Sequence, residues 1–219
     1  AMSVGGTSEY HTPFRERLWS DVVYLDPAQG AAAFDQMQAE PRDLALVIVE
    51  PMIQGAGGMR VYSEEFLGAV WNFCKINGVL LILDEVFTGF GRTGRTFAFE
   101  YAKSSGISPD LLCLSKGLTG GSLPLGLTLA TNQIFEAFLS HERARSLLHG
   151  HSYTANPLAC AAALESWKLL DSSDCAFRIE GISKWTAEKI GKIGELVPDG
   201  RAWSLGTIGA VDLNLRGTL

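Results

Sequence analysis

The chain has 219 residues, of which 47% are hydrophobic and 19% charged, and its formal net charge is −6. This composition is typical of a folded protein rather than a disordered one, and the negative balance argues against a general nucleic-acid or anionic-membrane binder. Apolar runs such as residues 79–83 are far too short to cross a bilayer. We therefore expect a globular protein with no nucleic-acid and no membrane partner.

Cysteines and histidines are sparse and scattered. No two cysteines form a Cys-x-x-Cys pair, which is typical of reduced thiols and argues against a disulfide framework or structural zinc. His149 and His151 flank Gly150, but no third ligand follows at a suitable spacing, so we expect loop or interface packing and no metal. The expected location is intracellular and soluble, either cytoplasmic or mitochondrial. The cysteines are Cys74, Cys113, Cys160 and Cys175.

Short apolar segments alternate with helical patterns as far as residue 171. The apolar segments are nearly continuous, which is typical of strands covered on both faces. Ser63 followed by two glutamates predicts a helix over 63–77, and Pro157 predicts the first turn of a helix over 156–170. Strands that alternate with helices indicate an α/β fold with a mostly parallel sheet. The expected strands cover residues 44–50, 79–84, 110–115 and 127–131.

The sequence "DSSD" (171–174) interrupts this pattern. A more polar helix is expected over about 174–195, followed by a strand in "GTIGAVDLNL" (206–215). We therefore predict a large domain over 1–172 and the beginning of a small C-terminal α+β domain over 173–219.

A G-x-G-x-x-G pattern at 89–94 follows the strand expected at 79–84. In dinucleotide-binding folds the first glycine follows the strand directly, so that the backbone can approach a pyrophosphate. Here five residues intervene, and two of them are Asp84 and Glu85, whose charges would repel a phosphate. We reject the nucleotide interpretation and predict that Glu85 is a structural hydrogen-bond acceptor pointing away from Asp84.

Asp84 ends one expected strand, and Lys116 follows the next. The carboxyl ends of parallel strands share one edge of a sheet, where α/β proteins bind ligands. A lysine amine and a carboxylate are the two groups that pyridoxal phosphate chemistry requires, the lysine for a Schiff base and the carboxylate for the ring nitrogen. On spacing alone, a plain salt bridge or no contact at all remains an alternative.

Four ordered segments resemble the class III aminotransferases of fold type I, over roughly residues 1–171. The resemblance implies the fold type I large domain, the cofactor pyridoxal 5′-phosphate and a homodimer. The segments are VIVEPMIQGAGGMRVY (47–62), DEVFTGFGRTG (84–94), PDLLCLSKGLTGG (109–121) and HGHSYTANPLACAAALESWKLL (149–170).

By this resemblance, Lys116 is the Schiff-base lysine and proton shuttle, Asp84 pairs with the pyridine nitrogen, and Val86 packs against the ring. Ser152 replaces the family's usual threonine, which reaches the cofactor phosphate of the partner subunit. The resemblance also implies that two further residues line the pocket behind these groups, Glu50 and Gln54. Phe87 stands where many members carry glutamine, a departure shared with the biotin-synthesis branch of the family.

Within the family, the first and last segments most resemble the branch that makes 7,8-diaminopelargonate in biotin synthesis, and the segment 84–94 is most similar to the plant and fungal forms of that branch. The implied substrates are 8-amino-7-oxononanoate and, as amino donor, S-adenosylmethionine. The alternatives are another ω-amino acid transaminase, of ornithine, acetylornithine or 4-aminobutyrate type, and a non-catalytic fragment. The family's phosphate loop and carboxylate-binding arginine have no match here, so we expect an incomplete chain that is inactive alone.

Overall fold

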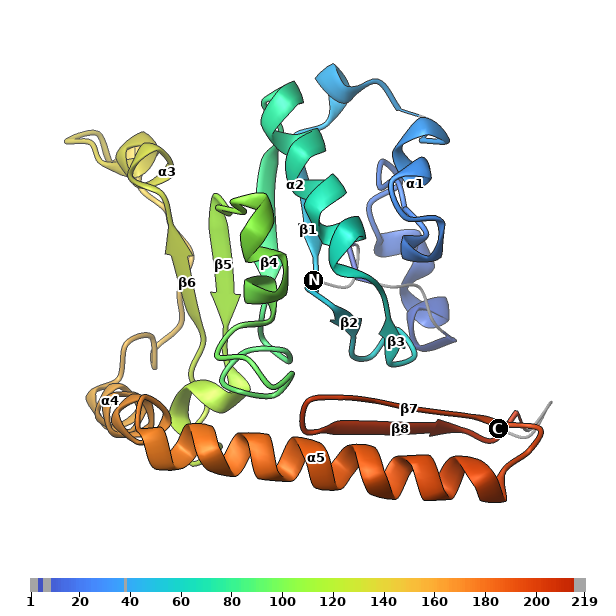
Figure 1. Cartoon of the computed structure of the whole chain (residues 1–219). Coiled ribbons are helices and arrows are strands. Elements are labelled where there is room, and N and C mark those ends of the chain that lie inside the picture. Colours follow the sequence, from blue (N-terminus) through green and yellow to red (C-terminus); the bar gives the residue numbers. More distant parts are fainter. Residues whose placement is uncertain (1–3, 6–8, 38, 215–219) are drawn as a thin grey trace.

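The computed structural model describes residues 4–5, 9–37 and 39–214, and its centre is a sheet in the order β1-β4-β5-β6. β1, β4 and β5 run parallel, and β6 runs antiparallel to β5 (Figure 1). Two hairpins, β2–β3 and β7–β8, lie outside this sheet. The α/β class and the mostly parallel sheet are confirmed. The strands are β1 (Leu46–Val49), β2 (Ile53–Gln54), β3 (Arg60–Val61), β4 (Leu80–Asp84), β5 (Leu111–Leu114), β6 (Leu127–Ala130), β7 (Arg201–Leu205) and β8 (Ile208–Asp212).

Helix ends follow the local sequence. α2 begins after Ser63, whose hydroxyl accepts a hydrogen bond from the Phe66 amide at 3.3 Å, and stops at Gly78, which has a φ of 66°. α4 begins after Asn156, whose side chain accepts from the Ala159 amide at 2.9 Å. The α-helices are α1 (Ala32–Asp35), α2 (Glu64–Asn77), α3 (Asn132–Phe138), α4 (Pro157–Leu170) and α5 (Ser173–Leu196). The 3₁₀ helices are η1 (Glu9–Arg17), η2 (Pro27–Gln29), η3 (Pro41–Asp43), η4 (Ala98–Ser105), η5 (Lys116–Thr119) and η6 (Arg143–Arg145).

The core lies on one face of the sheet. Leu81 and Leu83 of β4 are fully buried there, and Leu112 and Leu114 of β5 nearly so. They join apolar side chains of α2 and η4 in a single cluster. Burial of this continuous apolar surface is the main source of stability for these strands.

The expectation that all four strands are covered on both faces is wrong. Every residue of β6 is exposed, and on β4 Leu80 retains 37% of its accessible surface while Ile82 is half-buried. β6 lies at the edge of the sheet, and no side chain of α2 or η4 is packed with it in the core cluster of the described residues. The apolar sequence of β6 was therefore a correct signal for a strand but not for its burial.

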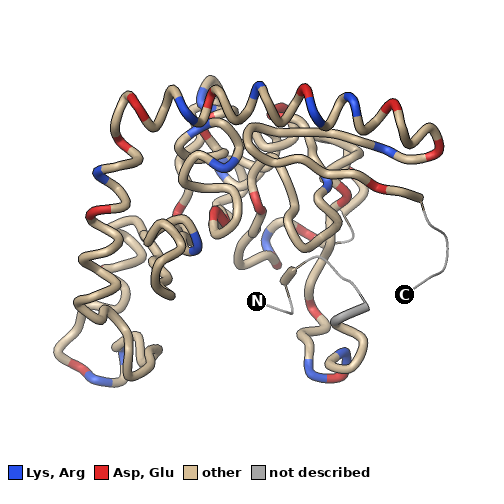
Figure 2. Tube along the Cα trace, turned by 90° about the horizontal axis from the view of Figure 1, so that it is seen from below, with Lys and Arg blue, Asp and Glu red and all other residues tan. Residues whose placement is uncertain are grey.

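α5 and the β7–β8 hairpin lie across the carboxyl ends of β1, β4 and β5 (Figure 1). Acidic and basic residues are interspersed along α5 (Figure 2), and several form pairs one turn apart, such as Arg178 with Asp174 at 2.8 Å. The start of α5 at Ser173 matches the expected helix, and β8 matches the strand predicted in 206–215, of which residue 215 lies outside the described part. β7 was not predicted. Among the described helices, none is long and apolar enough to cross a membrane.

Candidate active site

Three parallel strands deliver ionisable side chains to one edge of the sheet. Glu50 follows β1, Asp84 ends β4, and Lys116 comes two residues after β5. The charges of Asp84 and Lys116 both act on the carboxyl group of Glu50. The structure therefore brings together the carboxylate and the lysine that were predicted to converge, with Glu50 as a third member.

The backbone of Lys116 is held in an unusual conformation. Its φ is 43°, in the left-handed region that residues with a side chain rarely adopt. The next residue, Gly117, lies so close to Phe90 that an added Cβ would come within 2.7 Å of the Phe90 Cβ. Strained backbone of this kind costs about 1–3 kcal/mol and concentrates at functional sites. The packing of Phe90 on Gly117 helps to hold the lysine in place.

The Lys116 amine has no ionic partner. Neither Asp84 nor Glu50 lies within ion-pair distance of it among the pairs of the described residues. Its Nζ instead lies over the ring of Phe87, 5.2 Å from the ring centroid. The plain salt bridge that spacing left open is thus not formed.

Glu50 is a half-buried carboxyl group beside two other charges. Its Oε2 accepts a hydrogen bond from the Gly55 amide at 2.9 Å. Burial raises the pKa of Glu50, and the charge of Asp84 adds to the rise, while the Gly55 amide and the Lys116 charge oppose it. Glu50 can therefore hold a proton more readily than an exposed glutamate.

Asp84 presents one unused oxygen. Its Oδ1 accepts from the Val86 amide at 3.1 Å, and Oδ2 accepts no hydrogen bond from the described residues. Cys113 of β5 is its register partner, so the two side chains share the face of the sheet opposite the core. Burial raises the pKa of the Cys113 thiol, and the Asp84 charge raises it further.

The neighbouring acid Glu85 has a different role. It is fully buried and accepts hydrogen bonds from the Thr88 hydroxyl at 2.6 Å and from the amides of Ala98 and Phe99 at 3.0 and 2.9 Å. Burial nevertheless raises the pKa of Glu85, against the effect of these donors. The prediction of a structural acceptor is confirmed, because these donors tie the end of β4 to the start of η4.

Gln54 and Ser152 stand apart from the three charged groups. The Gln54 carbonyl accepts from Arg60 Nε at 3.0 Å across the β2–β3 hairpin, next to the Gly55 amide that binds Glu50. Ser152 is exposed in the loop before α4. His151 of the same loop uses its Nδ1 to accept from the Tyr153 amide at 3.1 Å. Among the described residues, no cluster of three metal-binding side chains occurs.

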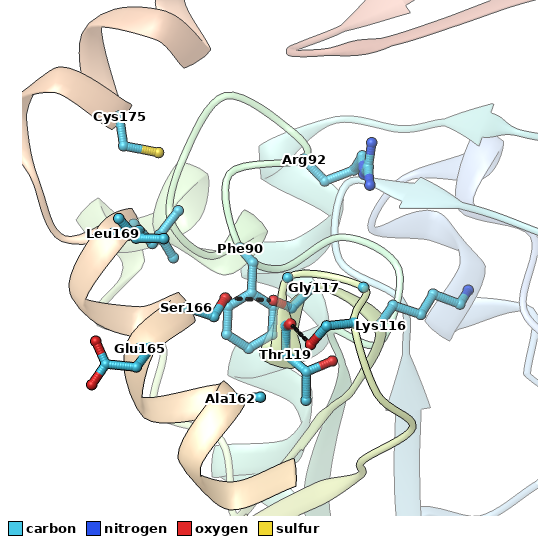
Figure 3. A pocket seen from close by; sticks show the side chains of 14 residues that line it. Phe90, Arg92, Lys116, Gly117, Thr119, Ala162, Glu165, Ser166, Leu169 and Cys175 are labelled. Atoms are coloured by element: carbon cyan, nitrogen blue, oxygen red, sulfur yellow. Dashed lines mark hydrogen bonds between the residues drawn. The ribbon is translucent and has the colours of Figure 1, made fainter. Parts of the chain in front are cut away.

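An open cavity of about 890 Å³ lies between η5, α4 and the start of α5. Figure 3 shows that the Lys116 side chain extends away from it, so that the turn 116–122 and α4 form most of its wall. The Ser166 hydroxyl bridges the two walls by donating to the Gly117 carbonyl at 3.4 Å. Because neither Asp84 nor Glu50 lines this cavity, we place the chemistry at the strand ends and not here.

The β7–β8 hairpin fixes the loops that surround the site. Trp203 Nε1 donates to the Met59 carbonyl at 2.8 Å, and both the amide and the hydroxyl of Thr207 donate to the Arg92 carbonyl at 3.0 Å. Gly206 lies against Thr93 so closely that a Cβ would overlap its backbone. Sequence reasoning missed this docking and the contact of Phe87 with Lys116, because both join segments that are distant in sequence and no spacing reports the contact.

The sequence profile of the Aminotransferase class-III family matches residues 1–218, and the chain belongs to this family. The adenosylmethionine-8-amino-7-oxononanoate aminotransferase of Synechococcus elongatus is 48% identical over 187 residues, which are 80% of this chain and 43% of that protein. The crystal structure of the enzyme of the same name from Methanocaldococcus jannaschii superimposes with a TM-score of 0.82 at 34% identity, covering 96% of this chain and 49% of that one. An ornithine aminotransferase of Plasmodium yoelii superimposes with a TM-score of 0.70 at 29% identity, over 85% of this chain and 47% of its own.

The chain thus spans about half the length of the relatives that it matches.

Proposed function

We propose that these residues serve a pyridoxal-phosphate-dependent transaminase of biotin synthesis, which converts 8-amino-7-oxononanoate to 7,8-diaminononanoate with S-adenosylmethionine as amino donor. The observation that carries the proposal is the convergence of Lys116 and Asp84 on Glu50 at the sheet edge, with Lys116 in a strained conformation and without an ion pair among the described residues. The names of the relatives from Synechococcus and Methanocaldococcus support the choice of substrates.

The chain's residues fit this cofactor in two respects. Asp84 Oδ2 is free to accept a hydrogen bond from a protonated ring nitrogen, and the Lys116 amine is free to bond to an aldehyde. When bound, pyridoxal phosphate supplies an electron-withdrawing ring that stabilises negative charge at the substrate carbon. The negative charge of Asp84 would keep a proton on the ring nitrogen, because an opposite charge at hydrogen-bond distance favours the protonated form.

Each remaining residue has a separate task in the proposal. Lys116 would hold the cofactor and, when released, would accept a proton from the substrate carbon and return it. Val86 would pack against the ring, and Glu50 and Gln54 would support the pocket through the Gly55 loop. Exposed Ser152 would serve the cofactor phosphate of a second copy in a homodimer.

The test maps the lysine that binds the cofactor. The full chain is incubated with pyridoxal phosphate, reduced with borohydride and digested, and the pyridoxyl label is located by mass spectrometry. We expect label on Lys116, its loss in Lys116→Ala, and its retention in the control Lys103→Ala, which removes an exposed lysine of η4. An even spread of label over surface lysines would contradict the assignment.

The amino donor separates this proposal from an ornithine-type or 4-aminobutyrate-type transaminase. Production of 7,8-diaminononanoate is measured with S-adenosylmethionine, ornithine or 4-aminobutyrate as donor, in a protein of the relatives' full length that contains this sequence. Only S-adenosylmethionine should support turnover, and an equal rate with ornithine would favour the alternative. We expect the 219-residue chain alone to show no sustained turnover; turnover by it would overturn the expectation that it is incomplete.

A further inference from the structure

Phe87 is the residue of this site that the proposed function leaves without a task. Among the described residues, its ring makes the only ring contact of the Lys116 amine, at 5.2 Å, and that amine makes no hydrogen bond or ion pair with them. The ring therefore decides where the free amine rests.

Phe87 packs against the backbone of the Gly55 loop. A Cβ added at Gly55 would come within 3.1 Å of Phe87 Cδ1, so the loop lies directly against the ring. The Gly55 amide donates to Glu50 Oε2 at 2.9 Å, which anchors that loop to the end of β1. The position of the ring is thus coupled to Glu50, one of the three ionisable groups of the site.

A ring face and a carboxylate hold an amine in different ways. An ion pair with Asp84 or Glu50 would occupy the carboxylate as well as the amine. At an exposed lysine, attraction to a ring face favours contact over separation by only about two- to fivefold, so the amine can leave the ring. The contact gives position while leaving Asp84 Oδ2 unoccupied.

We propose that Phe87 is a positioning residue whose ring holds the free Lys116 amine beside Asp84 and Glu50 without an ion pair. The role of Lys116 as the cofactor lysine rests on the proposed function, whereas the contact between ring and amine does not. Phe87→Leu keeps an apolar side chain and removes the ring, and Phe87→Tyr keeps the ring.

Two probes are applied to the full chain near neutral pH. Acetic anhydride reports the reactivity of each amine without demanding a particular orientation, and pyridoxal phosphate with borohydride reports capture by a large aldehyde. The Lys116 peptide is quantified against that of Lys189, an amine of α5 that lies over the Trp185 ring at 5.9 Å. In the matched control Trp185→Leu, the reference is Lys75 instead.

In Phe87→Leu, we expect acetylation of Lys116 to rise about two- to fivefold, because the amine loses the attraction that keeps it against the ring. The ratio of pyridoxal phosphate capture to acetylation should fall, because the amine is no longer held in place. Phe87→Tyr should restore both values, and Trp185→Leu should leave Lys116 unchanged. Gly55→Ala keeps Phe87, but the added methyl group would press on its ring. The acetylation rate and the capture ratio of Lys116 should therefore change in the same direction as in Phe87→Leu.

Equal Lys116 rates and ratios in the unsubstituted chain and Phe87→Leu would overturn the proposal. If Phe87→Tyr fails to restore the acetylation rate and the capture ratio of Lys116, the proposal would also be overturned, since the ring would then not be the cause. If circular dichroism shows that Phe87→Leu is unfolded, Gly55→Ala decides the question. If pyridoxal phosphate never labels Lys116 while acetylation responds as expected, the proposed function fails and the ring contact is upheld.

Discussion

Three leucines in one row of the sheet differ mainly in what covers them. Leu83 of β4, Leu112 of β5 and Leu129 of β6 are register partners on the same face, with exposed fractions of 0%, 8% and 48%. α2 and η4 join the core with β4 and β5, whereas β6 contributes nothing to that core cluster. The comparison teaches that cover by a neighbouring element, and not the residue type, decides what a leucine contributes to stability.

The same contrast separates two adjacent acids. Glu85 is buried and its oxygens are used by three donors, whereas Asp84 is half-buried and keeps one oxygen unused. The covered face therefore holds the acid that maintains the structure, and the less covered face holds the acid available for chemistry.

The largest effect is expected at Glu85. Glu85→Ala leaves the Thr88 hydroxyl and two amides without their acceptor inside the core, and should lower the free energy of unfolding by about 3–5 kcal/mol. Urea denaturation followed by circular dichroism measures the change. The exposed Glu165→Ala serves as control and should stay within about 0.5 kcal/mol. A small effect at Glu85 would break the contrast between the two acids.

The row of leucines gives a matched pair of substitutions. Leu83→Ala should lower the free energy of unfolding by about 2–5 kcal/mol, because it removes buried methyl groups and leaves a cavity. Leu129→Ala, on the exposed edge strand, should change it by less than about 0.5 kcal/mol. Equal losses in the two variants, measured by urea denaturation, would mean that β6 is covered in solution.

Cysteine reactivity sharpens the comparison without altering the fold. Burial raises the pKa of Cys74 to about 12, and its side chain lies in the core. At pH 8, a thiol reagent should therefore modify Cys160 and Cys175, which are partly exposed, long before Cys74. Mass spectrometry over time gives the order, and addition of urea should make Cys74 reactive. Early modification of Cys74 would show that the α2 layer opens readily.

The smallest effect is a pH dependence at Glu50. Burial and the nearby Asp84 raise the pKa of Glu50 in the folded chain. The stability that this acid contributes is therefore fully present below its unfolded pKa, about 4.3, and is lost as the pH rises through the folded pKa. Glu50→Gln has no such titration, so its stability relative to the unsubstituted chain should improve as the pH rises across that interval. A difference that is constant with pH would contradict the raised pKa.

Much of the fold and the site followed from local signals. The Ser63 and Asn156 caps set helix starts, because a side-chain acceptor next to free amides acts within one turn. Asp84 and Lys116 were predictable because strand ends in a mostly parallel sheet share an edge. The contact of Phe87 with Lys116 and the acceptance of the Gly55 amide by Glu50 were not, since no spacing in the sequence reports them.

The sequence by itself determined the four strands of the central sheet, the starts of α2, α4 and α5, and the convergence of Asp84 and Lys116 on one edge of the sheet, because periodicity, capping and strand direction act over short distances. Only the tertiary structure decided that β6 runs antiparallel and stays exposed, that β7 pairs with β8, and that this hairpin docks onto the loops at Met59 and Arg92. These features depend on which surfaces lie against one another. An apolar residue has the same transfer free energy wherever it stands, and only its neighbours determine whether that free energy is gained.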